Sequence, residues 1–130
     1  MTTAVRYYSR SGNTKAVAET IAKAAGVDAV SVDSADAGID APVDVLFVGG
    51  ALYAYGIDSH LRAYLESLDG SLVGKAVVFS TSWISKHAIE LVREALAEKD
   101  VSVAEETLYF RGKPNEAQLA EAEEFARKFL

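Results

Sequence analysis

The sequence contains no cysteine and no long apolar run, and each of these absences excludes a class of protein. It has only two prolines. Without cysteine there is no disulfide, no thiolate nucleophile and no cysteine-ligated zinc or iron–sulfur site. Any redox chemistry therefore needs a cofactor from outside. No stretch approaches the roughly 20 apolar residues that a membrane helix requires, so we expect no membrane contact and a cytoplasmic location.

Positive charge is also scarce. Nineteen acidic residues stand against thirteen basic ones, which gives a formal net charge of −6. This excess disfavours binding to nucleic acid or anionic lipid and suits a partner protein with a basic contact surface. The chain has 130 residues, and 50% of them are hydrophobic, which is enough for one core. We therefore expect residues 1–130 to form a single domain.

Short apolar runs alternate with helical patterns along the chain. The runs of strand length are Ala4–Tyr8, Ala29–Val32, Val43–Val48, Ala76–Phe79 and about Val101–Phe110. In the helical segments, apolar residues recur every three or four positions. Gly26 is the expected C-cap of the first helix and Asn115 the N-cap of the last. This alternation is typical of right-handed crossovers on a parallel sheet, and it predicts a three-layer α/β fold.

Two places depart from the pattern. The stretch around Ser34–Pro42 offers no apolar helical stripe, so we expect a short or irregular connection between the second and third strands. Arg6 interrupts a strand that should be buried on both faces. Either this position lies near an end of the sheet, or its guanidinium reaches a partner.

The segment "YSRSGNT" ends the first strand and opens the first helix. The first four N–H groups of a helix lack partners, and its dipole is positive at that end. Hydroxyls donate to phosphate oxygens, and Gly12 lets the backbone turn toward an anion. The same residues could merely cap the helix. Ligands gather at the carboxyl ends of parallel strands, and this position favours the anion site. The segment matches neither a Walker A motif nor the dinucleotide fingerprint.

Two aromatic loops are expected at the same edge of the sheet. They are "GGALYAYGID", after the third strand, and "STSWIS", after the fourth. Tyr53, Tyr55 and Trp83 are candidates for packing against a planar ring, because aromatic faces exclude water from flat heterocycles. The alternative for each is a place in the core. Three loops at one edge could hold a phosphate at one end and a ring at the other.

Several polar residues near these loops could have more than one role. Arg10 can turn toward a phosphate, a ring or solvent. The hydroxyls that follow the fourth strand can bond to a ligand or cap a helix, and no G-x-S-x-G elbow accompanies them. His60 and His87 lack a second ligand at helical spacing, so we expect no metal site.

Three segments resemble the flavodoxin family. "YYSRSGNTKAVAETIA" resembles its phosphate-binding loop, [ST]-x-[ST]-G-x-T, with Ser9, Ser11, Gly12 and Thr14 at the matching positions. "VDVLFVGGALYAYGIDSHLRAYLESL" is similar to the third strand, first flavin loop and following helix of short flavodoxin-like proteins. "KAVVFSTSWIS" is similar to the fourth strand and second flavin loop. The first flavin loop lacks a clearly matching tryptophan.

The resemblance implies a five-stranded parallel sheet of order 2-1-3-4-5 that binds one FMN without a covalent bond. The phosphate would lie at the first loop and the ring between the other two, with Ala54 and Gly56 near the N5 edge. The implied cofactor-binding residues are Ser9, Arg10, Ser11, Gly12, Asn13, Thr14, Tyr53, Ala54, Tyr55, Gly56, Ser80, Thr81, Ser82 and Trp83.

The function implied is an electron carrier between redox proteins, in which FMN supplies the chemistry and no residue acts as acid or base. An FMN-dependent reductase or oxidase acting directly on a quinone, a porphyrinogen or NAD(P)H is the alternative. A third is a receiver-like module without flavin, but the first strand ends without the paired acidic residues of a phosphoacceptor site. If the carrier hypothesis is right, the double substitution Ser11→Ala and Thr14→Ala weakens FMN binding far more than folding.

Overall fold

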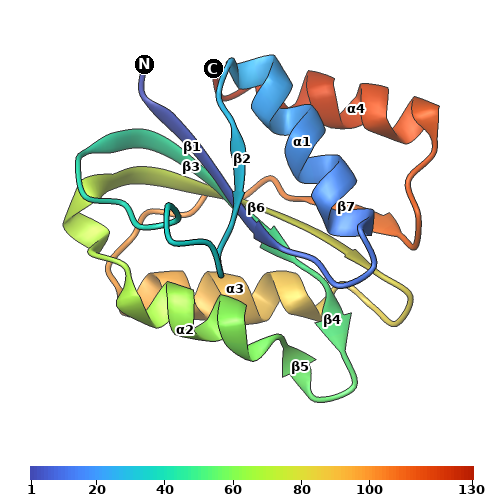
Figure 1. Cartoon of the computed structure of the whole chain (residues 1–130), viewed down its shortest axis with the longest axis horizontal. Coiled ribbons are helices and arrows are strands. Elements are labelled where there is room, and N and C mark those ends of the chain that lie inside the picture. Colours follow the sequence, from blue (N-terminus) through green and yellow to red (C-terminus); the bar gives the residue numbers. More distant parts are fainter.

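The computed structural model describes residues 1–130, in which a five-stranded parallel sheet lies between two layers of helices (Figure 1). The strands, in spatial order, are β2 (Ala29–Ser31), β1 (Thr3–Tyr8), β3 (Val43–Gly50), β6 (Val73–Ser82) and β7 (Leu108–Arg111). This confirms the predicted three-layer α/β fold and its 2-1-3-4-5 strand order.

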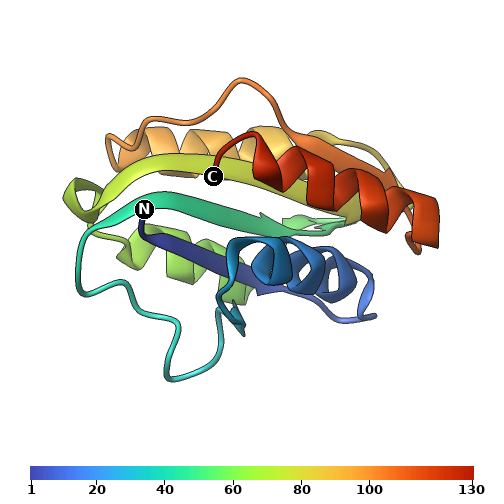
Figure 2. The same ribbon diagram turned by 90° about the horizontal axis from the view of Figure 1, so that it is seen from above.

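Four helices cover the sheet, two on each face (Figures 1 and 2). They are α1 (Asn13–Ala25), α2 (Ser59–Ser67), α3 (His87–Glu98) and α4 (Glu116–Arg127). Helices α1 and α4 pack on one face, and α2 and α3 on the other. As expected, Gly26 ends α1 in a left-handed conformation and Asn115 caps α4. No helix is both long and apolar enough to cross a bilayer.

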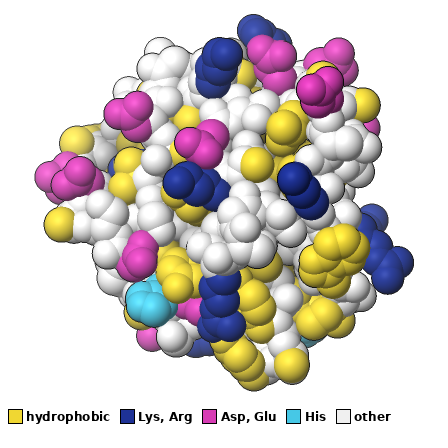
Figure 3. Space-filling view, turned by 45° about the vertical axis from the view of Figure 1, so that its right-hand side comes forward, with side chains coloured by type: hydrophobic (Ala, Val, Ile, Leu, Met, Phe, Trp, Pro, Cys, Tyr) yellow, Lys and Arg dark blue, Asp and Glu magenta, His cyan; other side chains and the backbone are white.

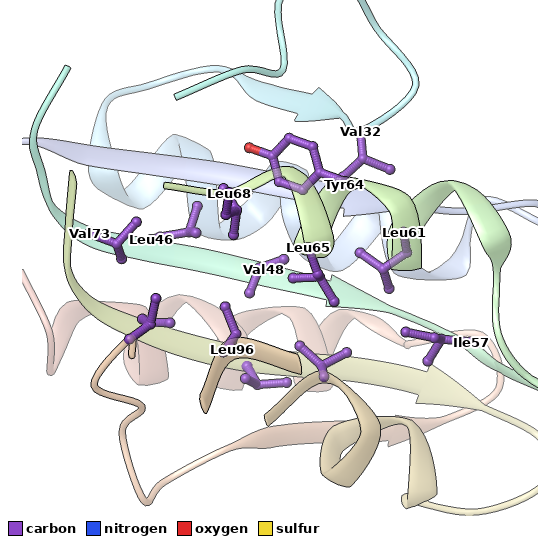
Figure 4. Close-up of a cluster of buried hydrophobic side chains, with 14 of the residues drawn as sticks. Val32, Leu46, Val48, Ile57, Leu61, Tyr64, Leu65, Leu68, Val73 and Leu96 are labelled. Carbon is purple, nitrogen blue, oxygen red and sulfur yellow. The ribbon is translucent and has the colours of Figure 1, made fainter. Parts of the chain in front are cut away.

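Each face of the sheet has its own apolar cluster, because successive residues of a strand point to opposite sides. In β3, Leu46 and Val48 face α2 and α3, whereas Phe47 faces α1 and α4. Leu65 from α2 and Leu96 from α3 complete the first cluster (Figure 4). A strand covered on both sides reads as one apolar run, which explains the sequence "VLFV".

Arg6 lies in the middle of β1, which is paired on both sides, so it is not at an end of the sheet. Its guanidinium instead reaches a partner: Nε donates to the carbonyl of Ala37 at 2.8 Å, and Tyr64 donates to the same oxygen at 2.7 Å. Ala37 belongs to the connection between β2 and β3, which contains no helix, as predicted. These two bonds tie that irregular connection to the sheet.

The predicted extent of the fifth strand was wrong. We expected a strand over about Val101–Phe110, but β7 begins at Leu108, and only Val103 forms an isolated bridge, to Ala76. The intervening Glu105 and Glu106 are exposed, and they carry the chain away from the sheet before it returns. Strand β6 runs longer than the predicted Ala76–Phe79 at both ends.

Three short elements were not predicted: the strands β4 (Leu52–Tyr53) and β5 (Gly56–Ile57), and the 3₁₀ turn η1 (Gly70–Leu72). Strands β4 and β5 pair antiparallel as a small hairpin after β3. In a parallel sheet all carboxyl ends share one edge, so the loops after β1, β3, β6 and β7 lie together at the right of Figure 1. This edge carries the candidate site.

A substitution at Leu65 tests the apolar cluster between the sheet and helices α2 and α3, because the Leu65 side chain is fully buried. We expect Leu65→Ala to lower the free energy of unfolding by about 2 to 5 kcal/mol, through lost apolar burial and the cavity left behind. Urea denaturation measures it. The matched control is Leu130→Ala, at a side chain 41% exposed, which should cost about 0.5 kcal/mol or less. Equal losses in the two variants would contradict this core.

Candidate functional site

The loops after β1, β3 and β6 enclose one pocket of about 300 Å³ at the carboxyl edge of the sheet. Its lining combines hydroxyl, amide and aromatic side chains with small apolar ones. The lining residues are Arg10, Ser11, Asn13, Ala51, Leu52, Tyr53, Ala54, Thr81, Ser82, Trp83 and Ile84. Residues from three separate sequence segments therefore share a single cavity.

The first loop presents backbone donors rather than a closed cap. Gly12, the N-cap of α1, has φ of 93°, a left-handed conformation that favours glycine. The N-cap residues of α1 and α3 make no side-chain cap bond, whereas α2 is capped by Asp58 and α4 by Asn115. The Ser9 hydroxyl accepts from the Gly12 N–H at 3.0 Å and shapes the turn. The start of α1 thus keeps donors for an anion, in the positive end of its dipole.

A buried hydrogen bond fixes this loop to the end of β6. The hydroxyls of Thr14 and Thr81 lie 2.7 Å apart, and both residues are 1% exposed. On β6, Ser80 donates to the carbonyl of Gly50 at 2.7 Å, which joins β6 to the end of β3. The Ser82 hydroxyl accepts from the Ile84 N–H at 2.9 Å and turns the chain after β6. These hydroxyls hold the three loops in a fixed arrangement.

The β4–β5 hairpin forms the second wall of the pocket. Tyr53 pairs with Gly56 across the hairpin, and Gly56 has φ of 117°. Tyr53 is half-buried and lines the pocket, whereas Tyr55 is exposed at the tip, with the two rings 6.0 Å apart. The guanidinium carbon of Arg10 lies 4.0 Å from the centre of the Tyr53 ring, in the range of a cation–π contact.

Arg10 joins the first loop to the hairpin through Asp58, a buried carboxylate that the sequence analysis missed. The guanidinium donates to Asp58 Oδ2 through Nη2 at 2.5 Å and Nε at 3.1 Å, and it also donates to the Tyr55 hydroxyl. Asp58 accepts from both the backbone N–H and Nδ1 of His60. The pattern Asp-Ser-His at a helix start is an N-cap signal that could have identified Asp58.

The surroundings of Arg10 and Asp58 favour the charged form of both side chains. Burial by itself raises the pKa of Asp58, but hydrogen bonds from the His60 backbone and from Arg10 outweigh it, and the pKa lies below its ordinary value. The bond to Asp58, then that to Tyr55, raises the pKa of Arg10 further above neutrality. Arg10 therefore stays cationic over the Tyr53 ring.

Trp83 forms the rim of the pocket opposite the hairpin. The residue is 67% exposed, yet its six-membered ring packs on the backbone of Gly112, where an added Cβ would overlap the ring. Gly112 also has φ of 71°, so both its backbone conformation and its contact with Trp83 favour glycine. The close approach holds an exposed indole in place.

Eight of the fourteen residues predicted to bind a cofactor line the pocket. Ser9, Gly12 and Thr14 shape the turn beneath it, and Ser80 is buried behind it. Tyr55 and Gly56 line an adjoining hollow of about 480 Å³ instead. Sequence reasoning missed the small apolar members of the lining, which carry no signal distinguishing them from core residues: Ala51, Leu52 and Ile84.

With this geometry in place, the comparisons decide the family. A family model described as a flavodoxin domain matches residues 4–129. The chain belongs to the flavodoxin family. A comparison with curated protein sequences finds no match.

Solved flavodoxin structures share the fold over almost the whole chain. Flavodoxin 2 from Bacillus cereus is 21% identical, with a TM-score of 0.80 over 99% of this chain and 97% of that one. A flavodoxin from the domain Archaea is 24% identical, with a TM-score of 0.73 over 99% and 96%. A short-chain flavodoxin associated with a bacterial microcompartment is 18% identical, with a TM-score of 0.77 over 99% and 97%.

Asp58→Asn tests the contribution of the buried carboxylate. Because the pKa of Asp58 is lowered from 3.8, its stabilisation is fully present above about pH 4 and is lost as the pH falls through the folded-state value. We expect the variant to unfold about 1 to 2 kcal/mol more easily at pH 7. Urea denaturation from pH 7 to acid should show this difference shrinking.

Asp36→Asn is the matched control, since Asp36 is exposed and its carboxylate makes no hydrogen bond. This variant should match the unsubstituted protein at every pH within about 0.5 kcal/mol. A difference at Asp58 that grows on acidification would contradict the lowered pKa.

Proposed function

We propose that this flavodoxin binds FMN in the pocket between its three loops and carries electrons between redox proteins. One observation supports the proposal above the others. A polar loop at a helix start without a side-chain cap and the aromatic residues Tyr53 and Trp83 line the same pocket. That arrangement suits a ligand with a phosphate at one end and a flat ring at the other. Bound FMN would supply the capacity to accept and release electrons.

The phosphate end fits a dianion. Gly12 provides no side-chain cap for α1, the Asn13 N–H makes only a long bond of 3.5 Å to the Ser11 hydroxyl, and Ser11 and Asn13 both line the pocket. Gly12 leaves open space, since nothing lies within 4 Å of where a Cβ would be. Backbone donors, a hydroxyl and an amide then bind the phosphate without requiring a buried lysine or arginine.

The ring end fits a planar heterocycle. Tyr53 and Trp83 both line the pocket, and Leu52 and Ile84 add apolar surface. Arg10 also lines the pocket, with its guanidinium carbon 4.0 Å from the centre of the Tyr53 ring. A fixed cation there favours negative charge on a ring bound beside it. Burial raises the pKa of Tyr53 above its ordinary value, although the nearby charge of Arg10 lowers it, so the hydroxyl stays protonated at neutral pH.

The surroundings of the pocket support a carrier that meets protein partners. Tyr55, Trp83 and Ile84 are 65%, 67% and 61% exposed, and they are three of the five exposed large hydrophobic residues of the chain. Exposed apolar side chains at the mouth of a pocket are typical of a contact surface. A partner covering them would come close to the ring end.

A second candidate is a reductase or oxidase acting directly on a small molecule. The observation that favours it is the adjoining hollow of about 480 Å³, which shares Leu52, Tyr53, Ala54 and Ile84 with the pocket. Steady oxidation of NAD(P)H by the FMN-loaded protein alone would support the enzyme. We expect no such turnover, and electron delivery to an acceptor protein only when a flavodoxin reductase is added.

Ser11→Ala tests the phosphate end. Removing a hydroxyl that donates to an anion should cost about 1.5 to 3 kcal/mol, or roughly 10- to 100-fold in the dissociation constant for FMN. Absorbance and fluorescence titration measure it. Ser11 is exposed, so the urea midpoint should not move. This single change is sharper than one including Thr14→Ala, because Thr14 also bonds to Thr81.

Ser102→Ala is the control, at an exposed serine on the loop before β7. It should leave FMN affinity unchanged. Equal affinity in the Ser11 and Ser102 variants would overturn the assignment of the first loop as the phosphate site.

A further inference from the structure

Basic residues gather around the mouth of the pocket although the chain is acidic overall. We define the basic rim as the six Lys and Arg residues of the segments 9–15, 51–62, 82–87 and 111–113. These residues are Arg10, Lys15, Arg62, Lys86, Arg111 and Lys113. Asp58 is the sole acidic residue of these segments. The rest of the chain then holds seven basic and eighteen acidic residues.

The charges of the basic rim are available to a partner. All six residues are exposed, and Arg10 alone forms a salt bridge, with the buried Asp58. None of the other five has a carboxylate within salt-bridge distance. The one acidic residue of these segments is thus buried and paired, so it contributes little negative potential to the surface.

Other carboxylates lie near this edge of the sheet, outside the four segments. Asp33 and Asp36 follow β2, at the side of the sheet, and Glu116 lies in the first turn of α4. Glu90 lies in α3 and accepts from His87 Nδ1 at 3.1 Å. These side chains flank the basic rim without entering the four segments that surround the pocket.

Apolar surface lies within the basic rim. Tyr55, Trp83 and Ile84 are exposed, and each belongs to the segments that carry the rim. Figure 3 shows hydrophobic and basic side chains side by side over the lower right of the face at the pocket edge, with most acidic side chains toward its upper and left margins. An apolar centre inside a charged border is the usual anatomy of a protein contact surface.

We propose that this face docks an electron-transfer protein whose own contact surface is acidic. The inference rests on the carrier function proposed above and names the kind of partner for that site. It reverses the expectation drawn from the net charge, which pointed to a basic partner. The rim spans loops from four strands and both helical layers, which is wider than a small anion needs and fits a protein.

Local charge outweighs net charge here because salt screens distant groups. At physiological ionic strength the screening length is about 8 Å, so the acidic residues on the far side of the molecule are largely hidden from a docking partner. The groups nearest the contact decide the sign of the interaction and the rate of encounter. For this flavodoxin those groups are cationic.

The test uses two cytochromes of opposite surface charge as probes, the acidic cytochrome b5 and the basic cytochrome c. Amide shifts of the ¹⁵N-labelled protein, with and without FMN, should move in segments 9–15, 51–62, 82–87 and 111–113 on addition of cytochrome b5 at low salt. Added salt should abolish them. The reduced, FMN-loaded protein should reduce cytochrome b5 more slowly as salt rises.

Two charge-reversal double variants distinguish the effect of the basic rim on binding from the effect of the net charge. Lys86→Glu with Lys113→Glu should weaken cytochrome b5 binding roughly tenfold. Lys23→Glu with Lys75→Glu changes the net charge equally at exposed sites near the opposite edge of the sheet, and it should weaken binding by less than about twofold. Both double variants should retain FMN affinity, because none of these residues lines the pocket.

The outcomes distinguish the docking inference from the proposed function. Failure to bind FMN would remove the proposed function, whereas the amide shifts would still report on the docking face. The docking inference is overturned if cytochrome c, and not cytochrome b5, shifts the four segments. It is equally overturned if neither probe shifts them, or if both double variants weaken binding to the same extent.

Discussion

The buried hydrogen bond between Thr14 and Thr81 is the interaction on which the pocket depends. It joins residues 67 positions apart, at a distance of 2.7 Å, where α1 begins and β6 ends. Each hydroxyl is shielded from water, so removing one leaves the other without a partner and costs more than one exposed bond would. Arg10 and Asp58 form the second tie, between the first loop and the hairpin. Together these contacts hold the first loop against the end of β6 and against the hairpin.

The polar residues of the site therefore divide into two groups. Thr14, Ser80 and Asp58 are buried and hold the loops, whereas Ser11 and Asn13 face the pocket. In the proposed function, the backbone at the start of α1 donates to the phosphate, and no charged side chain is needed there. This leaves the Lys and Arg side chains at the carboxyl edge of the sheet exposed and free to meet a partner, which is how an acidic chain acquires a basic face.

The sequence was sufficient where the signal is local. Apolar periodicity predicted the layers, and the cap residues Gly26 and Asn115 predicted the end of α1 and the start of α4. The strand order followed from the resemblance to flavodoxins. The sequence was insufficient where long-range contacts decide. The path after Val101 depends on where two exposed glutamates leave the sheet, and the extra length of β6 depends on pairing with β3 at its start and with β7 at its end. Whether a hydroxyl faces a ligand or another strand, as at Ser80, also depends on neighbours distant in sequence. Asp58 could have been predicted from the sequence, because it carries an N-cap signal.

The measurement that tests the account most directly is a crystal structure of the protein grown with FMN. The account predicts the phosphate at the start of α1, beside Ser11 and Asn13, and the ring between the β4–β5 hairpin and Trp83. Thr14 and Thr81 should remain bonded as they are here. FMN bound elsewhere on the surface, or a phosphate away from the start of α1, would contradict the claim that these three loops form one cofactor site.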